Sequence, residues 1–89
     1  MFDWDVDKAK ANLTKHGVSF EAADDFDFTA SVIRLDNRAD YGEPRWVAVG
    51  FIRRRLHVLV YTERETRFRI ISLRRANSRE RRNYEQAKA

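Results

Sequence analysis

The fold is constrained most strongly by four strand-like segments that follow one another between residues 31 and 74. They are rich in β-branched, aliphatic and aromatic residues, and they cover residues 31–35, 45–52, 56–63 and 67–74. Turn-forming residues at 36–44 predict a loop, and the short turns at 53–55 and 64–66 predict two hairpins. Hairpin-connected strands run antiparallel. The sequence therefore predicts an antiparallel sheet over this part of the chain.

Helix signals lie before this predicted sheet. Asp5 or Asp7 can cap a first helix that runs to about His16, because a short carboxylate accepts hydrogen bonds from the free N–H groups of the first turn. Gly17 is a natural end, since glycine readily adopts the left-handed conformation that closes many helices. Ser19 can cap a second, shorter helix. We therefore expect two helices before the sheet.

A helix signal also follows the predicted sheet. Asn77 precedes Glu80 by three residues, which is the spacing of a capping box, and predicts a final helix of about ten residues. With a short edge strand at residues 2–4, the order of elements is β-α-α-β-β-β-β-α, which is typical of the α+β class. We predict one domain over residues 1–89. Its antiparallel four- to five-stranded sheet has two N-terminal helices on one face and a C-terminal helix at an edge or on part of the other, which leaves some sheet surface open for a site.

The net charge of +4 conceals an uneven distribution. Residues 1–43 contain ten acidic and five basic residues, whereas residues 44–89 contain four acidic and thirteen basic residues, all but one of them arginine. Such a chain presents a positive face that attracts a polyanion or an acidic protein partner. Arginine favours the first interpretation, because its planar guanidinium binds phosphate through two hydrogen bonds and stacks on bases. A solvated arginine-rich surface is the alternative.

Several classes of protein are not favoured by the sequence. The chain has no cysteine, which excludes disulfides and thiolate chemistry and fits the reducing cytoplasm. No apolar run approaches the roughly 20 residues that a membrane-spanning helix needs, and the acidic N-terminus does not resemble a signal peptide. Two histidines far apart do not suggest a zinc site, and three glycines do not suggest a phosphate-binding loop. We expect a cytoplasmic protein without cofactor, metal or membrane partner.

A candidate site lies at the last predicted hairpin. If its turn has three residues, Glu63 lies opposite Arg67 and Tyr61 lies opposite Arg69, so all four side chains share one face of the sheet. A two-residue turn at positions 65–66 breaks this group, because a shift of register by one residue moves a side chain to the other face.

The four side chains have the chemistry for RNA cleavage. RNA carries its own nucleophile, the 2′-hydroxyl beside each phosphate, so an enzyme must position it, remove its proton and neutralise the developing charge. Glu63 is the candidate base, and the arginines are the candidate charge stabilisers. The proton donor for the leaving 5′-oxygen stays open among Tyr61, Tyr84, His57 and His16. A Glu–Arg ladder that only stabilises an exposed sheet is the structural alternative.

Other side chains have two interpretations each. Lys15 and His16 suit the C-terminal end of a helix, where positive charge is favourable, but Lys15 could also contact an RNA backbone. Trp4 and Trp46 could stack on bases, although each lies in an apolar run that suggests the core or a partner-facing position. The arginines at 53–55 are expected to be a solvated hairpin tip that adds to long-range attraction.

A set of ordered motifs resembles a known family. The N-terminal part reads Trp4-Asp5-x-x-Lys8 and then Asn12-Leu13-x-Lys15-His16-Gly17-Val18-x-Phe20-x-x-Ala23. Arg45 follows before a strand, and then Tyr61-Thr62-Glu63-Arg64, Arg69-Ile70-Ile71-Ser72-Leu73-Arg74-Arg75-Ala76 and Glu80-Arg81-x-x-Tyr84. From end to end, this pattern resembles the BrnT toxins of the RelE-like group. The family usually has alanine where Leu73 stands.

The resemblance implies a fold, an activity and partners. It implies a RelE-like fold and a type II toxin that cleaves mRNA without a metal and so inhibits translation. It also implies a BrnA-like antitoxin of the ribbon-helix-helix type, which neutralises the toxin and with it represses their operon, so that DNA is contacted only through the antitoxin. By motif, the expected catalytic residues are Glu63, Arg64, Arg69, Arg74 and Arg75. The expected RNA-binding residues are Lys15, His16, Arg67, Tyr61 and Tyr84.

Two other functions remain open at this point. A non-catalytic RNA-binding module would show salt-dependent affinity for RNA and no cleavage. A degenerate toxin that acts only as antitoxin partner and corepressor would bind the antitoxin tightly and leave RNA intact.

Overall fold

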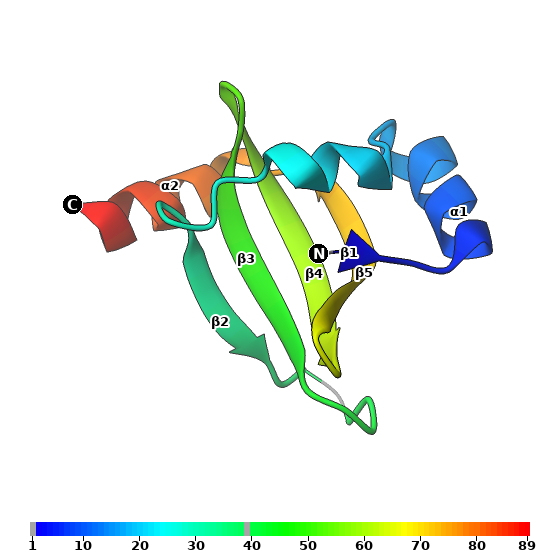
Figure 1. The fold of residues 1–89 in the computed structure, drawn as a ribbon. Helices are drawn as coiled ribbons and strands as arrows, with labels where there is room; N and C mark the ends of the chain where they lie inside the picture. Colours follow the sequence, from blue (N-terminus) through cyan, green and yellow to red (C-terminus); the bar gives the residue numbers. More distant parts are fainter. Residues whose placement is uncertain (1, 39) are drawn as a thin grey trace.

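A computed structural model describes residues 2–38 and 40–89 of the chain. Along the sequence, the elements are β1 Phe2–Asp3, α1 Val6–His16, the 3₁₀ helix η1 Phe20–Asp25, β2 Val32–Asp36, β3 Arg45–Ile52, β4 Arg55–Arg64, β5 Arg67–Arg75 and α2 Ser78–Lys88. They form one sheet with helices before and after it (Figure 1). The predicted α+β class is confirmed, and the elements follow the predicted order except that the second helix is a 3₁₀ helix. Of the described helices, none is long and apolar enough to cross a membrane.

The sheet has five strands in the order β1-β5-β4-β3-β2. The last four strands pair antiparallel, as expected, but β1 pairs with β5 in parallel, with Phe2 opposite Phe68 and Asp3 opposite Arg69. The prediction of an antiparallel-only sheet was therefore wrong. The parallel pair forms because the chain leaves β1 into α1 and reaches β5 only after the whole meander, so no hairpin turn constrains its direction.

The second N-terminal helix is a 3₁₀ helix of six residues, not the expected α-helix. Its two buried residues, Phe20 and Ala23, are three positions apart, which matches the three residues per turn of a 3₁₀ helix. The N–H of Phe26 donates to the carbonyl of Ala23 and ends the helix. Ser19 caps it as predicted, through a hydrogen bond from Glu21 N to its hydroxyl.

The other predicted helix ends are confirmed. Asp5 accepts hydrogen bonds from the backbone of Asp7 and Lys8 at the start of α1. Gly17 ends α1 with a φ of 70°, and its N–H donates to Leu13. The Asn77–Glu80 pair forms a complete capping box at the start of α2.

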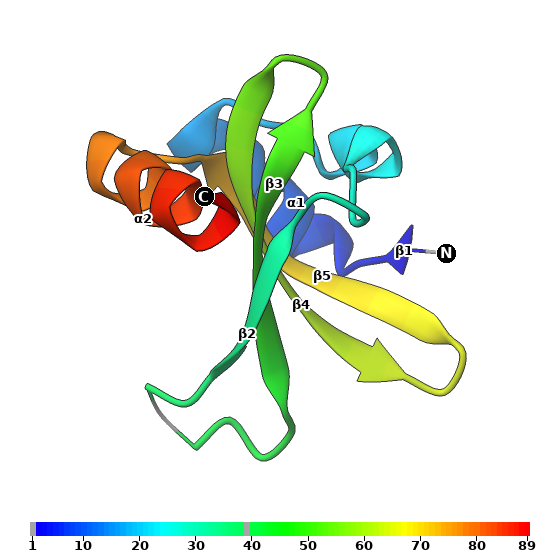
Figure 2. The ribbon, with the colours of Figure 1, turned by 90° about the vertical axis from the view of Figure 1, so that its left-hand side faces the viewer.

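The two faces of the sheet are covered differently. In Figure 1, η1 crosses in front of β3 and β4 whereas α2 lies behind them, and α1 lies beside β5. Figure 2 shows α2 and η1 on opposite sides of the twisted sheet. The α1/η1 side contains the hydrophobic core, in which Ala48, Leu59, Ile70 and Leu73 are fully buried. We call this side the core face. The prediction that the N-terminal helices cover one face and α2 covers part of the other is consistent with this arrangement.

An aromatic cluster extends the core toward the end of the sheet where β1 lies. Phe28 packs against Phe2, Phe26, Tyr61 and Phe68, with ring centroids 4.8 to 6.1 Å apart. Trp4 packs edge-on against Phe20 and Trp46 packs against the core, as expected for two tryptophans in apolar runs.

Asn12 joins α1 to the edge of β5. Its side-chain amide donates to the carbonyls of Val18 and Leu73, and its carbonyl oxygen accepts from the N–H of Leu73. The pairing of β4 with β5 shifts register between Val60 and Tyr61, which leaves Ile71 as an extra residue in β5, two positions before Leu73. The buried Asn12 side chain thus provides hydrogen-bond partners for backbone groups of β5 that β1 is too short to reach.

Candidate functional site

The β4–β5 hairpin has a different register from the one that would gather the candidate site. Its turn has two residues, with Arg64 opposite Arg67 and Glu63 opposite Phe68. Glu65 adopts a positive φ of 55°, which allows the tight turn. This is the two-residue turn that the sequence left open as the alternative. It breaks the group of Tyr61, Glu63, Arg67 and Arg69, because Arg67 and Arg69 lie on the face opposite Tyr61 and Glu63.

The two tyrosines of the prediction have packing roles. Tyr61 is 5 % exposed in the core face, with its ring against Phe28 and Phe68, and burial raises the pKa of its phenol. Tyr84 of α2 donates its hydroxyl proton to the carbonyl of Ala30 at 2.7 Å and packs edge-on against Phe51. Tyr84 therefore holds α2 against the sheet.

The second face of the sheet gathers arginines from all four long strands. Strand alternation and register place six of them there, and we call this surface the arginine face: Arg34, Arg45, Arg64, Arg67, Arg69 and Arg74. Valines occupy the same face between them, since Arg34 pairs with Val47 and Arg74 with Val58. Four of the six, Arg64, Arg67, Arg69 and Arg74, were predicted from the sequence. Arg34 and Arg45 were missed; each alternates with valines in its strand, but this pattern places them on the arginine face only once the order of strands is known.

Basic residues of α1 extend the arginine face past the edge of β5. A polar pocket of about 320 Å³ is lined by Arg45, Arg64 and Arg69 from the sheet and by Lys8 from α1, together with Asp5, Glu43, Ile70 and Ile71. A second pocket of about 250 Å³ adjoins it through Lys8 and Ile71, and contains Lys15 and His16. The structure thus brings the predicted Lys15 and His16 to the same basic surface, and adds Lys8.

Acidic partners orient several of these arginines. Glu80 accepts two hydrogen bonds from the guanidinium of Arg74, at 2.7 and 2.9 Å, and these bonds lower the pKa of Glu80 and raise that of Arg74. Glu43 accepts a hydrogen bond from Arg64 at 3.1 Å, and Asp3 lies 3.5 Å from Nε of Arg69.

Other arginines of this surface have no such partner. Arg34 and Arg67 form no ion pair with any residue in the described part of the chain. Arg45 lies over the ring of Tyr41, with its guanidinium carbon 4.0 Å from the ring centroid. A surface with both fixed and unpaired guanidinium groups is suited to a chain of phosphates, which needs oriented contacts and free positive charge.

His16 is the histidine of this surface. Burial lowers its pKa below the usual value for histidine, and the charges of Lys15 and Arg74 lower it further. At neutral pH its imidazole is therefore largely neutral and able to accept a proton. His57, the other candidate, is 6 % exposed on the core face, with Nδ1 2.8 Å from the carbonyl oxygen of Arg55. Burial lowers the pKa of His57 as well, but its ring lies away from the arginine face.

The remaining predicted site residues lie elsewhere. Glu63 is exposed on the side of the sheet that holds Tyr61 and Phe68. Arg75 pairs with His57 in register and is exposed at the far end of that side. The two residues are thus separated from the arginine face, whereas the other three predicted catalytic residues, Arg64, Arg69 and Arg74, lie on it.

The match to a family model agrees with the motifs. Within residues 2–38 and 40–89, no group of three histidine, cysteine or acidic side chains is placed to hold a metal ion. A comparison with curated proteins finds no match. The family model described as a ribonuclease toxin, BrnT, of a type II toxin–antitoxin system matches residues 4–80, which include α1, all four long strands and the first turn of α2. The chain belongs to the BrnT family of ribonuclease toxins.

Proposed function

We propose that this protein is an endoribonuclease toxin that cleaves mRNA on the arginine face and so inhibits translation. The observation that carries the proposal is the convergence of six arginines from four strands with Lys8, Lys15 and His16 of α1 on one continuous surface. Such a surface binds a polyanion by neutralising several phosphates at once. The family description supplies the reaction class, ribonuclease.

The chemistry uses the substrate's own nucleophile. The 2′-hydroxyl loses its proton to a base, its oxygen attacks the adjacent phosphorus, and the bond to the 5′-oxygen breaks while that oxygen takes a proton from solvent. The products are a 2′,3′-cyclic phosphate and a 5′-hydroxyl. Arg69 and Arg64, which line the same polar pocket, stabilise the charge on the phosphate oxygens in the transition state. Arginine suits this role because it stays protonated and binds two oxygens at once.

His16 is the best-placed group to remove the proton from the 2′-hydroxyl. It adjoins the polar pocket, and its lowered pKa keeps it in the form that accepts a proton. Glu63, the base suggested by the motif, lies on the other side of the sheet. The two assignments make opposite predictions for His16→Ala and Glu63→Gln, so the base can be identified by substitution.

The proposal includes a protein partner. The family is defined by a type II toxin–antitoxin system, in which a protein antitoxin pairs with the toxin. We propose a ribbon-helix-helix antitoxin that covers the arginine face, blocks cleavage and, in complex with the toxin, represses their operon. The positive charge of residues 44–89 favours an acidic covering segment.

The proposed activity can be tested on purified cellular RNA in the presence of a metal chelator. We expect fragments that end in a 2′,3′-cyclic phosphate, and an unchanged rate when the chelator is added. Intact RNA together with salt-dependent binding would instead identify a non-catalytic RNA-binding module. Intact RNA without binding, with tight association with the antitoxin, would identify a corepressor only.

A further inference from the structure

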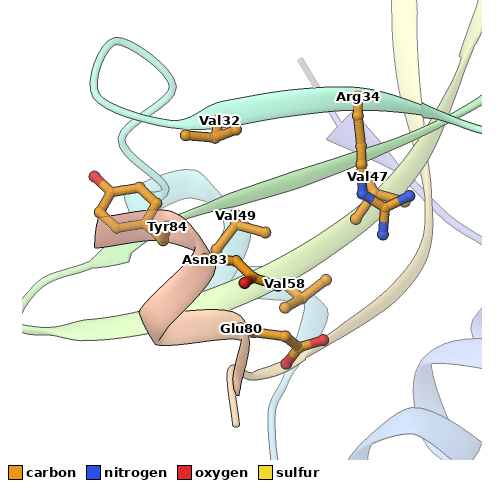
Figure 3. Close-up of a pocket in the computed structure, with 8 residues that line it drawn as sticks. All are labelled: Val32, Arg34, Val47, Val49, Val58, Glu80, Asn83 and Tyr84. Carbon is orange, nitrogen blue, oxygen red and sulfur yellow. The ribbon is translucent and has the colours of Figure 1, made fainter. Parts of the chain in front are cut away.

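An apolar pocket lies on the arginine face, next to α2. It has a volume of about 260 Å³, and its floor is made by Val32, Val47, Val49 and Val58 from three adjacent strands (Figure 3). Tyr84, Asn83 and Glu80 of α2 form one wall, and Arg34 extends over Val47 on another side. The proposed cleavage chemistry does not use this pocket.

Part of the floor is apolar surface that the fold leaves accessible: Val32 and Val49 are partly exposed, whereas Val47 and Val58 are buried. Every residue of α2 is described and none of them is buried. This helix is held on the sheet by the contacts of Tyr84 and by the hydrogen bonds between Arg74 and Glu80. Apolar surface gathered in a concave site is characteristic of a ligand position, because its burial is completed when the ligand binds.

The charges around the pocket favour a nucleic-acid ligand. Arg34 has no ion-pair partner among residues 2–38 and 40–89. Glu80, the acidic residue of the lining, is neutralised by its two hydrogen bonds from Arg74. A ligand here therefore meets an apolar floor with positive charge at its rim, which suits a nucleobase attached to a phosphate backbone.

Asn83 gives the pocket a means to distinguish bases. It is exposed at the wall, its amide points toward Val49 and Val58, and it makes no side-chain hydrogen bond within the described part of the chain. A carboxamide presents a donor and an acceptor side by side, which can match the edge of a base.

We propose that this pocket holds one unstacked nucleobase of the RNA strand, with the valines under its ring, Asn83 at its edge and Arg34 at its phosphate. The inference rests on the proposed function, since it places a base of the same substrate on the surface that binds its backbone. The pocket is a specificity site, and the bond that is cleaved lies near the polar pocket of Arg45, Arg64 and Arg69.

The test compares the binding of labelled single-stranded oligo-A, oligo-C, oligo-G and oligo-U, and of an abasic oligomer of the same length, to the full chain and its variants. We expect wild-type protein to prefer one base and to bind the abasic oligomer several-fold more weakly. Val49→Phe, which fills the pocket, should lower the affinity for the preferred oligomer to the affinity for the abasic one. Asn83→Ala should reduce the preference among bases by about fivefold or more.

Two controls accompany the variants. Gln86→Ala removes an exposed amide from the same helix outside the pocket and should leave the base preference unchanged. Asn83 is exposed, so Asn83→Ala should fold even if Val49→Phe does not, and a thermal unfolding curve for each variant shows which are folded.

The outcomes separate this inference from the proposed function. If wild-type protein cleaves RNA but both variants keep its base preference, the pocket does not hold a base while the proposed function stands. If wild-type protein neither binds nor cleaves RNA, the proposed function fails. If the variants lose only their binding to the antitoxin and keep the base preference, the pocket is a protein-binding site and the inference is overturned.

Discussion

The two faces of the sheet differ in composition and in what covers them. The core face is lined by aliphatic and aromatic side chains beneath α1 and η1, and its central residues are inaccessible to solvent. The arginine face has guanidinium groups spaced by valines, and it is covered in part by α2 and by the segment that holds Tyr41 and Glu43. The same alternating strands supply both, because successive side chains point to opposite sides. One face thus stabilises the fold, while the other is free to meet a ligand.

The largest expected effect belongs to the arginine face. His16→Ala should lower the rate of RNA cleavage by about a hundredfold or more, because a general base contributes that much to proton transfer. The free energy of unfolding should change little, since His16 lies at the end of α1 and is only partly buried. Cleavage rates check the first expectation, and urea unfolding of the same preparations checks the second.

The pH dependence of cleavage sharpens this assignment. Since the pKa of His16 is lowered from its usual value, the active neutral form should predominate already at neutral pH, and the rate should fall only as the solution becomes acidic. A rate that is unchanged in His16→Ala and keeps its pH profile would remove His16 from the mechanism.

The next effect belongs to the core face. Asn12→Ala removes three hydrogen bonds and leaves the backbone of Leu73 and the carbonyl of Val18 without partners in a buried place. We expect the free energy of unfolding to fall by about 3 kcal/mol. Thr14→Ala, an exposed position on the same helix, is the matched control and should be nearly neutral. Equal midpoints in urea for the two variants would contradict this role of Asn12.

A close contact on the core face gives a smaller effect. A Cβ at Gly50 would lie 2.8 Å from Cζ of Phe26 and 3.0 Å from Cβ of Ser31. Gly50→Ala should therefore lower the free energy of unfolding by about 2 kcal/mol through overpacking. Phe26→Leu makes space, so the two substitutions together should cost less than their sum. Strict additivity in this double-mutant cycle would show that the contact is not the cause.

The smallest effect concerns a buried carboxylate at the end of β2. Hydrogen bonds from Arg38 lower the pKa of Asp36 from 3.8 to about 2. A lowered pKa in the folded state stabilises the protein above the unfolded value, and this stability is lost as the pH falls from 3.8 toward 2. Because Arg38 is 69 % exposed and screened by solvent, the contribution is about 1 kcal/mol. Asp36→Asn should flatten the acid side of the stability profile, and an unaltered profile would contradict the assignment.

The parts of the fold that depend on local signals could be predicted from the sequence. The caps at Asp5, Gly17 and Asn77 and the three antiparallel pairings follow from residues close together in the chain. The parallel β1–β5 pair and the contact of Asn12 with Leu73, 61 residues away, could not be predicted, because nothing local encodes them.

The candidate site was predictable only in part. The arginines of β5 were found, but their grouping with Glu63 depended on one residue of turn length, which the tight turn at Glu65 decides. Arg34 and Arg45 could be placed beside them only when the order of strands was known, since they come from distant segments.

One measurement tests the division between the two faces most directly. It is the cleavage of purified RNA by two single variants of the same hairpin, Arg69→Ala on the arginine face and Glu63→Gln on the opposite side. We predict that Arg69→Ala loses cleavage while Glu63→Gln retains it, with both proteins folded. Loss of cleavage in Glu63→Gln alone, with full activity in Arg69→Ala, would place the chemistry on the other side of the sheet and contradict this account.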